Sequence, residues 1–241
     1  MTPSFRLLAI TPPQGPVPPA IVSTWLGDGP GLALLLREPG RSARELLAAD
    51  GRLAAIRRAC VAAGIPVLLS IGPEDLDLEI PPDIAGLHLR GDPDLPTLTR
   101  ARATRTRPVP SDIRDPRVIA SAAWLGRSCH GAPQPGDALV DYTLFAPVFA
   151  PTTAQPGRPL GSKTPAGLAA LRAWTAAPKA CVFALGGVGP ATAAACLEAG
   201  AHGLAGIGVF FGEPGQVAQD VAALREIVAA FDRHVEPVSP R

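Results

Sequence analysis

Two glycine-rich segments in the second half of the chain have residue types that bind phosphate. Gly186 and Gly187 follow a short apolar run, and Pro190 then begins a predicted helix. Adjacent glycines let a ligand approach the backbone, and a helix N-terminus offers free N–H groups and a positive dipole end. Gly206 and Gly208 form a second turn after the next apolar run. We expect these four glycines to hold a phosphate group; the alternative is that they only make tight turns.

Arg37 and His130 have side chains that could act on a bound anion. Arg37 ends an apolar run, where a guanidinium can hold a carboxylate or phosphate by two hydrogen bonds. The alternative for Arg37 is an ion pair with Glu38 or with a neighbouring helix. His130 ends the segment 126–130 and can carry a proton near neutral pH. Cys129 would point to the opposite face of a strand, so we expect no Cys–His nucleophilic pair.

Other polar residues allow weaker predictions. The stretch that contains Thr152 and Thr153 is long and rich in proline and glycine, so it is either a lid or an ordered surface loop. His88 is more typical of a hydrogen-bonded histidine inside a barrel than of a catalyst. Asp92 and Asp94 could bind a metal ion, but loop aspartates beside prolines more often shape turns.

Short apolar runs alternate with longer amphipathic segments along the chain, which predicts a parallel sheet flanked by helices. Strands are expected at residues 7–10, 32–36, 67–69, 86–89, 124–128, 142–145, 181–184 and 203–207. Helices are expected at 18–26, 42–63, 97–105, 164–176, 190–199 and 216–233, with Ser42 as a cap and Gly64 as a stop. Eight alternations predict a (β/α)₈ TIM barrel; a doubly wound open sheet is the alternative.

The barrel prediction places the chemistry and the domain limits. The active site of such a barrel lies at the C-terminal ends of its strands, and loops after strands 7 and 8 frequently bind phosphate. We expect a single domain over residues 1–241, with a core of about residues 5–234. Prolines 133 and 135 disfavour a helix, so the fifth helix should be shortened or missing. Residues 106–122 look like an insertion of unknown purpose.

Composition excludes several classes of partner. Lysine and arginine total 22 and aspartate and glutamate 21, so the net charge of +1 gives no reason to expect nucleic acid or a membrane surface as a partner. The four cysteines have no metal-ligand spacing and should be reduced, mostly buried thiols. We expect a cytoplasmic protein without a signal peptide or membrane span, and the sequence is compatible with a homo-oligomer.

Several short motifs, taken together in their order, resemble the thiamine phosphate synthase/thiazole tautomerase (TenI) family, which has a (β/α)₈ fold. The resemblance covers nearly the whole chain. Its landmarks are Leu8-Ala9-Ile10-Thr11, Leu36-Arg37-Glu38, Gly86-Leu87-His88-Leu89, Asp94-Leu95-Pro96, Gly126-Arg127-Ser128-Cys129-His130, Asp141-Tyr142, Pro147-Val148-Phe149, Ala184-Leu185-Gly186-Gly187 and Ala199-Gly200-Ala201-His202-Gly203.

The resemblance implies a thiazole tautomerase as the first prediction. The Gly-Arg-Ser-x-His pattern is similar to the tautomerase form of the fifth strand, in which the histidine moves the proton that makes a dihydrothiazole carboxylate phosphate aromatic. His130 falls on that histidine, and Arg37 would hold the carboxylate. Ser128, Thr152 and Thr153 join the glycines as expected substrate-binding residues. The ligand would be a small phosphorylated thiazole or a related molecule, and no cofactor would be needed.

Two alternatives remain from the same resemblance. A thiamine phosphate synthase would join hydroxymethylpyrimidine pyrophosphate to thiazole phosphate with the help of Mg²⁺. This chain has Ser70-Ile71 where the synthase pattern has Asn-Asp, Pro39 in place of a lysine, and no lysine after Thr152-Thr153. Lys163 is a cation that could substitute. The second alternative is a non-catalytic barrel that binds a phosphorylated ligand and regulates or supports other enzymes.

Overall fold

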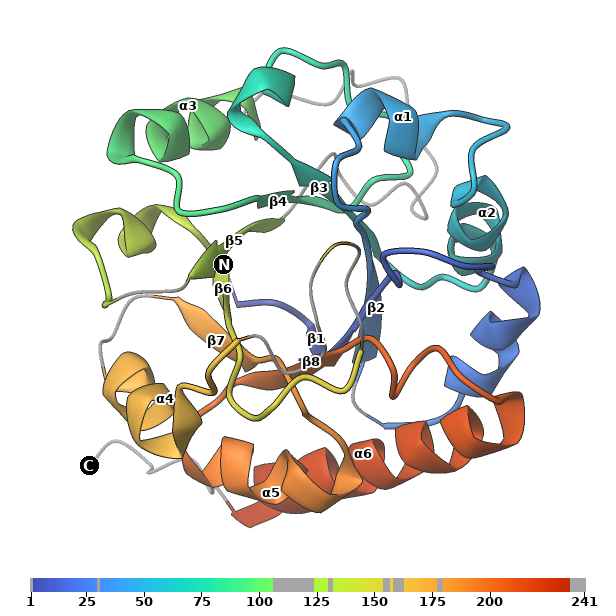
Figure 1. Cartoon of the computed structure of the whole chain (residues 1–241), viewed down its shortest axis with the longest axis vertical. Coiled ribbons are helices and arrows are strands. Elements are labelled where there is room, and N and C mark those ends of the chain that lie inside the picture. Colours follow the sequence, from blue (N-terminus) through green and yellow to red (C-terminus); the bar gives the residue numbers. More distant parts are fainter. Residues whose placement is uncertain are drawn as a thin grey trace.

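The computed structural model has eight parallel strands that close into a barrel in the order β1 to β8 (Figure 1). It describes residues 2–29, 31–105, 124–129, 132–153, 157, 163–176 and 180–234. The strands are β1 (Phe5–Ile10), β2 (Gly31–Leu36), β3 (Val67–Ile71), β4 (Gly86–Leu89), β5 (Trp124–Cys129), β6 (Tyr142–Phe145), β7 (Cys181–Ala184) and β8 (Gly203–Gly206). β8 pairs with β1, which confirms the TIM barrel and excludes the open sheet.

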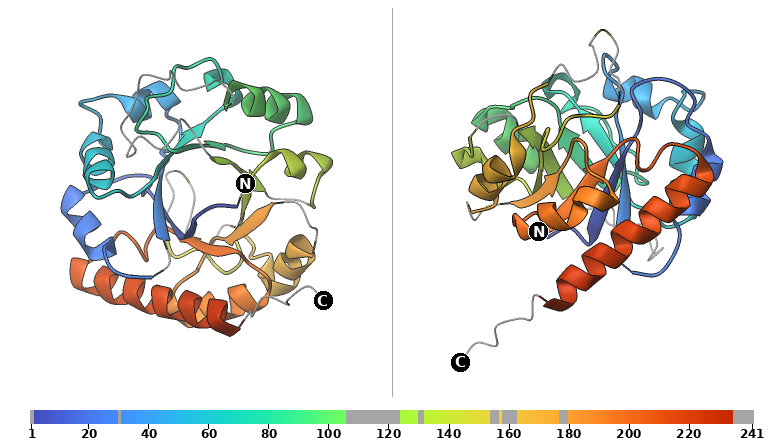
Figure 2. Two further views of the ribbon diagram at one scale, coloured as in Figure 1. Left: turned by 180° about the vertical axis from the view of Figure 1, so that it is seen from behind. Right: turned by 60° about the horizontal axis from the view of Figure 1, so that its bottom comes forward.

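Helices surround the barrel on its outside (Figures 1 and 2). They are α1 (Ala43–Leu47), α2 (Ala54–Ala62), α3 (Leu95–Arg105), α4 (Gly167–Thr175), α5 (Pro190–Glu198) and α6 (Pro214–His234). Shorter 3₁₀ helices are η1 (Pro19–Trp25), η2 (Pro73–Asp75) and η3 (Pro135–Leu139). None of the described helices is long and apolar enough to cross a membrane.

The helix predicted at 42–63 is wrong as one continuous helix. Ser42 does cap α1, with Ser42 Oγ accepting from the Glu45 N–H and the Glu45 carboxylate accepting from the Ser42 N–H. The chain then turns at Ala48–Leu53, where Asp50 and Gly51 favour a turn, and α2 begins at Ala54. Gly64 ends α2 with φ +71°, as predicted.

Between β5 and β6 the described chain has only the 3₁₀ helix η3, as the prolines predicted. An ion pair replaces the usual helix contact. Arg127 on β5 donates from Nε to Oδ1 of Asp137 on η3 at 2.7 Å, and both side chains are almost fully buried. The Asp137 carboxylate also accepts from the backbone N–H of Gln134 at 2.6 Å. Arg127 further lies 5.9 Å from the centre of the Trp174 ring on α4.

Alternate residues of each strand enter two separate apolar clusters. The inner cluster fills the barrel and includes Phe5, Leu35, Leu68, Tyr142 and Phe183. The outer cluster packs the other face of the strands against the helices. Side chains alternate between the two faces of a strand, so every second residue points into the barrel. The last inward-facing side chain of each strand therefore lies nearest the mouth of the barrel.

Candidate functional site

A pocket lies at the C-terminal ends of the strands, where the fold predicts an active site. Its volume is about 1030 Å³, including space open to solvent. Apolar side chains from four strands or strand ends form part of the lining: Ile10, Leu144, Leu185 and Ile207. The predicted catalytic residue Arg37 lines this pocket together with all of the predicted substrate-binding residues, namely Ser128, Thr152, Thr153, Gly186, Gly187, Gly206 and Gly208.

The two glycine turns have backbone that approaches other parts of the chain closely. Gly186 and Gly187 have φ of +96° and +62°, which favours glycine. A Cβ on Gly187 would lie 2.7 Å from the carbonyl oxygen of Ala150. Within the described residues, no acceptor contacts the N–H of Gly187 or of Gly208. Gly186 and Gly187 therefore allow a tight turn that a larger residue could not make, and Gly187 and Gly208 present N–H groups without an acceptor among the described residues.

The loop after β6 lies over the glycine turns. Val148 and Phe149 donate backbone hydrogen bonds to the carbonyl oxygens of Leu185 and Gly186, at 2.9 and 3.0 Å. A Cβ built on Gly208 would lie 3.5 Å from Thr153 Oγ1 and 4.0 Å from Thr152 Oγ1. Two hydroxyl groups therefore stand beside the backbone of the second glycine turn. Hydroxyl and backbone N–H donors together suit the oxygens of a phosphate.

Arg37 extends from the end of β2 and is fixed by its backbone. Its N–H donates to Thr11 Oγ1 at 2.8 Å, and Thr11 Oγ1 donates to the Arg37 carbonyl oxygen at 2.6 Å. Within the described part of the chain, its guanidinium has no hydrogen bond or ion pair. Burial, and then the charge of Arg90, lower the pKa of Arg37. An unpaired guanidinium at a pocket is a ready partner for an anion.

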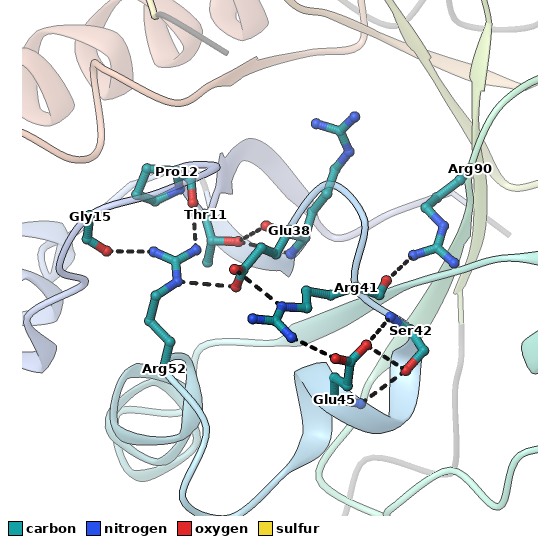
Figure 3. Close-up of polar contacts among 10 residues, drawn as sticks. Thr11, Pro12, Gly15, Glu38, Arg41, Ser42, Glu45, Arg52 and Arg90 are labelled. Atoms are coloured by element: carbon teal, nitrogen blue, oxygen red, sulfur yellow. Dashed lines mark hydrogen bonds and ion pairs between the residues drawn. The ribbon is translucent and has the colours of Figure 1, made fainter. Parts of the chain in front are cut away.

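Glu38 does not pair with Arg37, so the ion pair considered from the sequence is wrong. Arg52 on the turn before α2 donates from Nε to Glu38 Oε2 at 3.1 Å, and Arg41 Nε lies 3.7 Å from Glu38 Oε1 (Figure 3). Arg52 also donates to the carbonyl oxygens of Pro12 and Gly15, both at 2.7 Å. Glu38 is thus neutralised on the outer side of the loop, which leaves Arg37 available to the pocket.

Ser128 is held by a hydrogen-bonded pair inside the barrel. His88 on β4 contacts Ser128 Oγ through Nε2 at 3.0 Å and the Tyr142 hydroxyl through Nδ1 at 3.2 Å. Burial, and then the charge of Arg37, lower the pKa of His88 to about 3, so its ring is neutral at physiological pH. His88 is therefore a hydrogen-bonded barrel histidine, as predicted, and it orients the Ser128 hydroxyl that lines the pocket.

Arg90 and Lys163 add positive charge to the pocket. Arg90 directly follows β4, and we did not predict a role for it. Its position after a buried strand is the same signal that singled out Arg37. Lys163, which was considered as a substitute cation, comes from the far end of the β6–α4 loop. Among the described lining residues the charged side chains are these two and Arg37, and none is a carboxylate.

The described residues around the pocket do not fit a protein-held Mg²⁺, which prefers carboxylate ligands. Asp94 instead caps α3, where Oδ1 accepts from the Thr97 N–H at 3.0 Å, and hydrogen bonds from Thr97 lower its pKa. Ile71 is fully buried in the outer core, and Ser70 Oγ is buried without a described partner. In the described ranges, no three His, Cys, Asp or Glu side chains are grouped to hold a metal ion.

Two further predictions concern the end of β5. Cys129 is buried outside the barrel, its Sγ faces the Leu144 carbonyl oxygen at 3.3 Å, and burial raises its pKa to about 12. Its position outside the barrel agrees with the expected orientation of its side chain, and the absence of a Cys129–His130 pair stays a prediction. The four cysteines are free thiols, and three of them are buried. His130 lies outside the described residues, as do 106–122, so the proton-transfer role of His130 stays a prediction.

Comparisons with known proteins identify the family. A family model described as thiamine monophosphate synthase matches residues 110–210. The thiamine-phosphate synthase of Moorella thermoacetica is 33% identical over 211 residues, which cover 83% of this chain and 83% of that protein. The residues matched by the family model include the end of β5 and the glycine turn after β7.

Solved structures share the fold. Thiamine phosphate pyrophosphorylase from Pyrococcus furiosus superposes with a TM-score of 0.59 at 20% identity, over 95% of this chain and 97% of that chain. The 3-hexulose-6-phosphate synthase from Salmonella typhimurium gives 0.58 at 12% identity, over 94% and 100%. At these identities the likeness concerns the barrel alone. The sequence similarity to the Moorella enzyme over most of both chains goes further: this chain belongs to the thiamine phosphate synthase/TenI family.

Proposed function

We propose that this protein is a thiamine phosphate synthase, which joins hydroxymethylpyrimidine pyrophosphate to thiazole phosphate. The observation that carries the proposal is the arrangement of the pocket. Unpaired glycine N–H groups and threonine hydroxyls lie after β6, β7 and β8, and arginines lie after β2 and β4. The name of the Moorella relative supports the synthase over the tautomerase that the sequence first suggested.

The pocket suits two anionic groups on either side of flat rings. The thiazole phosphate would bind at the glycine turns, where N–H and hydroxyl donors match phosphate oxygens. The pyrophosphate would bind at Arg37 and Arg90, which can each donate several hydrogen bonds to oxygens. The apolar side chains of Ile10, Leu144 and Ile207 would contact the rings between them.

In this reaction the thiazole nitrogen forms a bond to the methylene carbon of the pyrimidine, and the bond from that carbon to pyrophosphate oxygen breaks. Negative charge therefore develops on the departing pyrophosphate. Fixed guanidinium groups stabilise such charge without having to reorganise. Arg37, part-buried and without a guanidinium partner among the described residues, is the residue that we expect to contact the leaving group.

A second candidate function is the thiazole tautomerase, which the 126–130 segment favours. Its Gly-Arg-Ser-x-His pattern places a histidine two residues after Ser128, and Ser128 lines the pocket. The substrate of that reaction also carries two anions, a phosphate and a carboxylate. His130 would move the proton, and Arg37 would hold the carboxylate.

The test supplies the purified protein with each substrate set and measures the product. We expect thiamine phosphate from the two synthase substrates, detected after oxidation to fluorescent thiochrome. Arg37→Met should lower kcat/KM roughly 10- to 100-fold, the value of one or two charge-assisted hydrogen bonds. Arg44→Met, an exposed arginine on α1, is the matched control and should leave activity unchanged.

The other outcomes separate the alternatives. Aromatisation of the dihydrothiazole carboxylate phosphate, lost in His130→Ala by about 10²–10⁴-fold, would replace the synthase with the tautomerase. Binding of thiazole phosphate without turnover of either substrate set would make the chain a ligand-binding barrel.

A further inference from the structure

Three hydrogen bonds to the segments after β2 and β3 fix the Arg90 guanidinium at the mouth of the barrel. Its Nη1 donates to the carbonyl oxygen of Arg41 at 2.6 Å (Figure 3). Its Nη2 donates to Glu74 Oε1 at 2.8 Å and to Asp75 Oδ2 at 3.3 Å. These three bonds leave Nε–H and one Nη1–H of the five guanidinium donors. Arg90 thus lines the pocket with its orientation already fixed.

The two carboxylates that hold Arg90 come from the segment after β3, on η2. Asp75 is nearly buried, and its Oδ2 also accepts from the N–H groups of Gly72 and Ala43, at 3.0 and 3.3 Å. These bonds anchor Asp75 to the start of η2 and to α1. The carboxylates of Glu74 and Asp75 are therefore already paired with a cation, the Arg90 guanidinium.

Arg37 and Arg90 carry like charges on the same pocket, at the ends of β2 and β4. The two guanidiniums repel one another, and the charge of Arg90 adds to burial in lowering the pKa of Arg37. Glu38, the carboxylate beside Arg37, is paired with Arg52 and Arg41. A bound anion between the two guanidiniums would remove their repulsion and satisfy the remaining donors.

We propose that Arg37 and Arg90 form a metal-independent site for a diphosphate group, in which the Arg90 guanidinium links the carboxylates of Glu74 and Asp75 to the substrate. A divalent cation commonly makes such a link between protein carboxylates and phosphate oxygens. Here a fixed guanidinium makes it, and the described lining offers no carboxylate for a metal ion. Naming the ligand a diphosphate rests on the proposed synthase function.

The test is the binding of inorganic pyrophosphate to the full chain by isothermal titration calorimetry, in EDTA and in excess Mg²⁺. The wild type should bind in EDTA, with an affinity no more than a few-fold below that in Mg²⁺. Arg90→Met should weaken binding in EDTA roughly 10- to 100-fold. The matched control Arg44→Met should bind as the wild type does. Circular dichroism should show that each variant is folded.

Glu74→Gln is a second variant, since the Glu74 side chain is 64% exposed and its loss should not affect folding. This variant keeps the charge of Arg90 but removes one of the ion pairs that hold it, so we expect pyrophosphate binding in EDTA to weaken a few-fold. Binding by the wild type only when Mg²⁺ is present would overturn the proposal, as would an Arg90→Met variant that binds like the wild type.

The outcomes also separate this proposal from the proposed function. Pyrophosphate binding in EDTA without formation of thiamine phosphate would retain the anion site and reject the synthase. Formation of thiamine phosphate that requires Mg²⁺, with no binding of pyrophosphate in EDTA, would retain the synthase and reject the anion site.

Discussion

At the scale of single residues, the pocket depends on polar groups that are paired on one side and open on the other. Thr11 fixes the backbone of Arg37, His88 orients Ser128, and Glu74 with Asp75 fixes Arg90. Arg37 and Arg90 keep guanidinium donors that have no acceptor among the described residues, and Ser128 presents its hydroxyl to the pocket. Preorganised donors of this kind bind an anion without first losing side-chain entropy.

His88 should make stability depend on pH. Its folded-state pKa of about 3 lies below the value of 6.5 for an unperturbed histidine, so below pH 6.5 the unfolded chain binds a proton that the folded chain does not. The stability that neutral His88 provides is complete above pH 6.5 and falls as the pH drops toward 3, by at most about 1.4 kcal/mol per pH unit.

Urea denaturation at several values between pH 7 and pH 4 measures this contribution. We expect His88→Asn to be less stable than the wild type at pH 7 but to lose stability less steeply on acidification. His202, whose pKa burial also lowers, contributes in the same direction in both proteins. Equal slopes for wild type and variant would show that His88 does not titrate as its surroundings indicate.

At the scale of elements, the Arg127–Asp137 ion pair holds η3 against β5, where a helix would otherwise pack. We expect Asp137→Ala to lower the free energy of unfolding by about 3–5 kcal/mol, since it removes the direct partner of the buried Arg127 and leaves that guanidinium 3.8 Å from the half-exposed Asp92 carboxylate. Asp232→Ala is the matched control. It breaks an ion pair with Arg6 in which the Asp232 side chain is 43% exposed, and it should cost no more than about 1 kcal/mol.

Urea denaturation of both variants provides the comparison. Because β5 carries Ser128, Asp137→Ala should also weaken the binding of thiazole phosphate. If Asp137→Ala and Asp232→Ala destabilise the protein equally, the pair does not anchor η3.

The elements also show what the sequence could predict. The continuous apolar runs of β2 and β3 identify buried parallel strands. In a parallel barrel all strands end at the same mouth, so the residues that follow each strand lie together there. The break between α1 and α2 was not predicted because Leu46, Leu53 and Ile56 keep helical spacing across it, and all three are buried. The spacing of apolar residues shows which side of a segment is buried. It does not reveal a turn after which the next helix buries the same side.

The site was predicted in part for a related reason. The glycine turns have a local signal, and Arg37 stands out at the end of an apolar run. Arg90 has the same local signal, but its significance comes from Glu74 and Asp75, which reach it from a short 3₁₀ helix after another strand. Contacts between loops that follow different strands form only when the barrel closes, and a single sequence does not reveal them.

At the scale of the whole molecule, barrel closure brings threonines and glycine turns after β6, β7 and β8 into one pocket with the arginines after β2 and β4. β8 pairs with β1 and closes the ring, and apolar side chains such as Ile10, Leu144 and Ile207 line the same pocket. In the proposed synthase, two anion sites in one pocket would hold the two phosphorylated substrates side by side.

A crystal structure of the protein with thiazole phosphate and inorganic pyrophosphate, grown in EDTA, would locate both anions. We expect the thiazole phosphate at the N–H groups of Gly187 and Gly208, with pyrophosphate between Arg37 and Arg90 and no metal ion beside it. Pyrophosphate at the glycine turns, or an Arg90 that stays paired only with Glu74 and Asp75 while pyrophosphate binds elsewhere, would contradict this expectation.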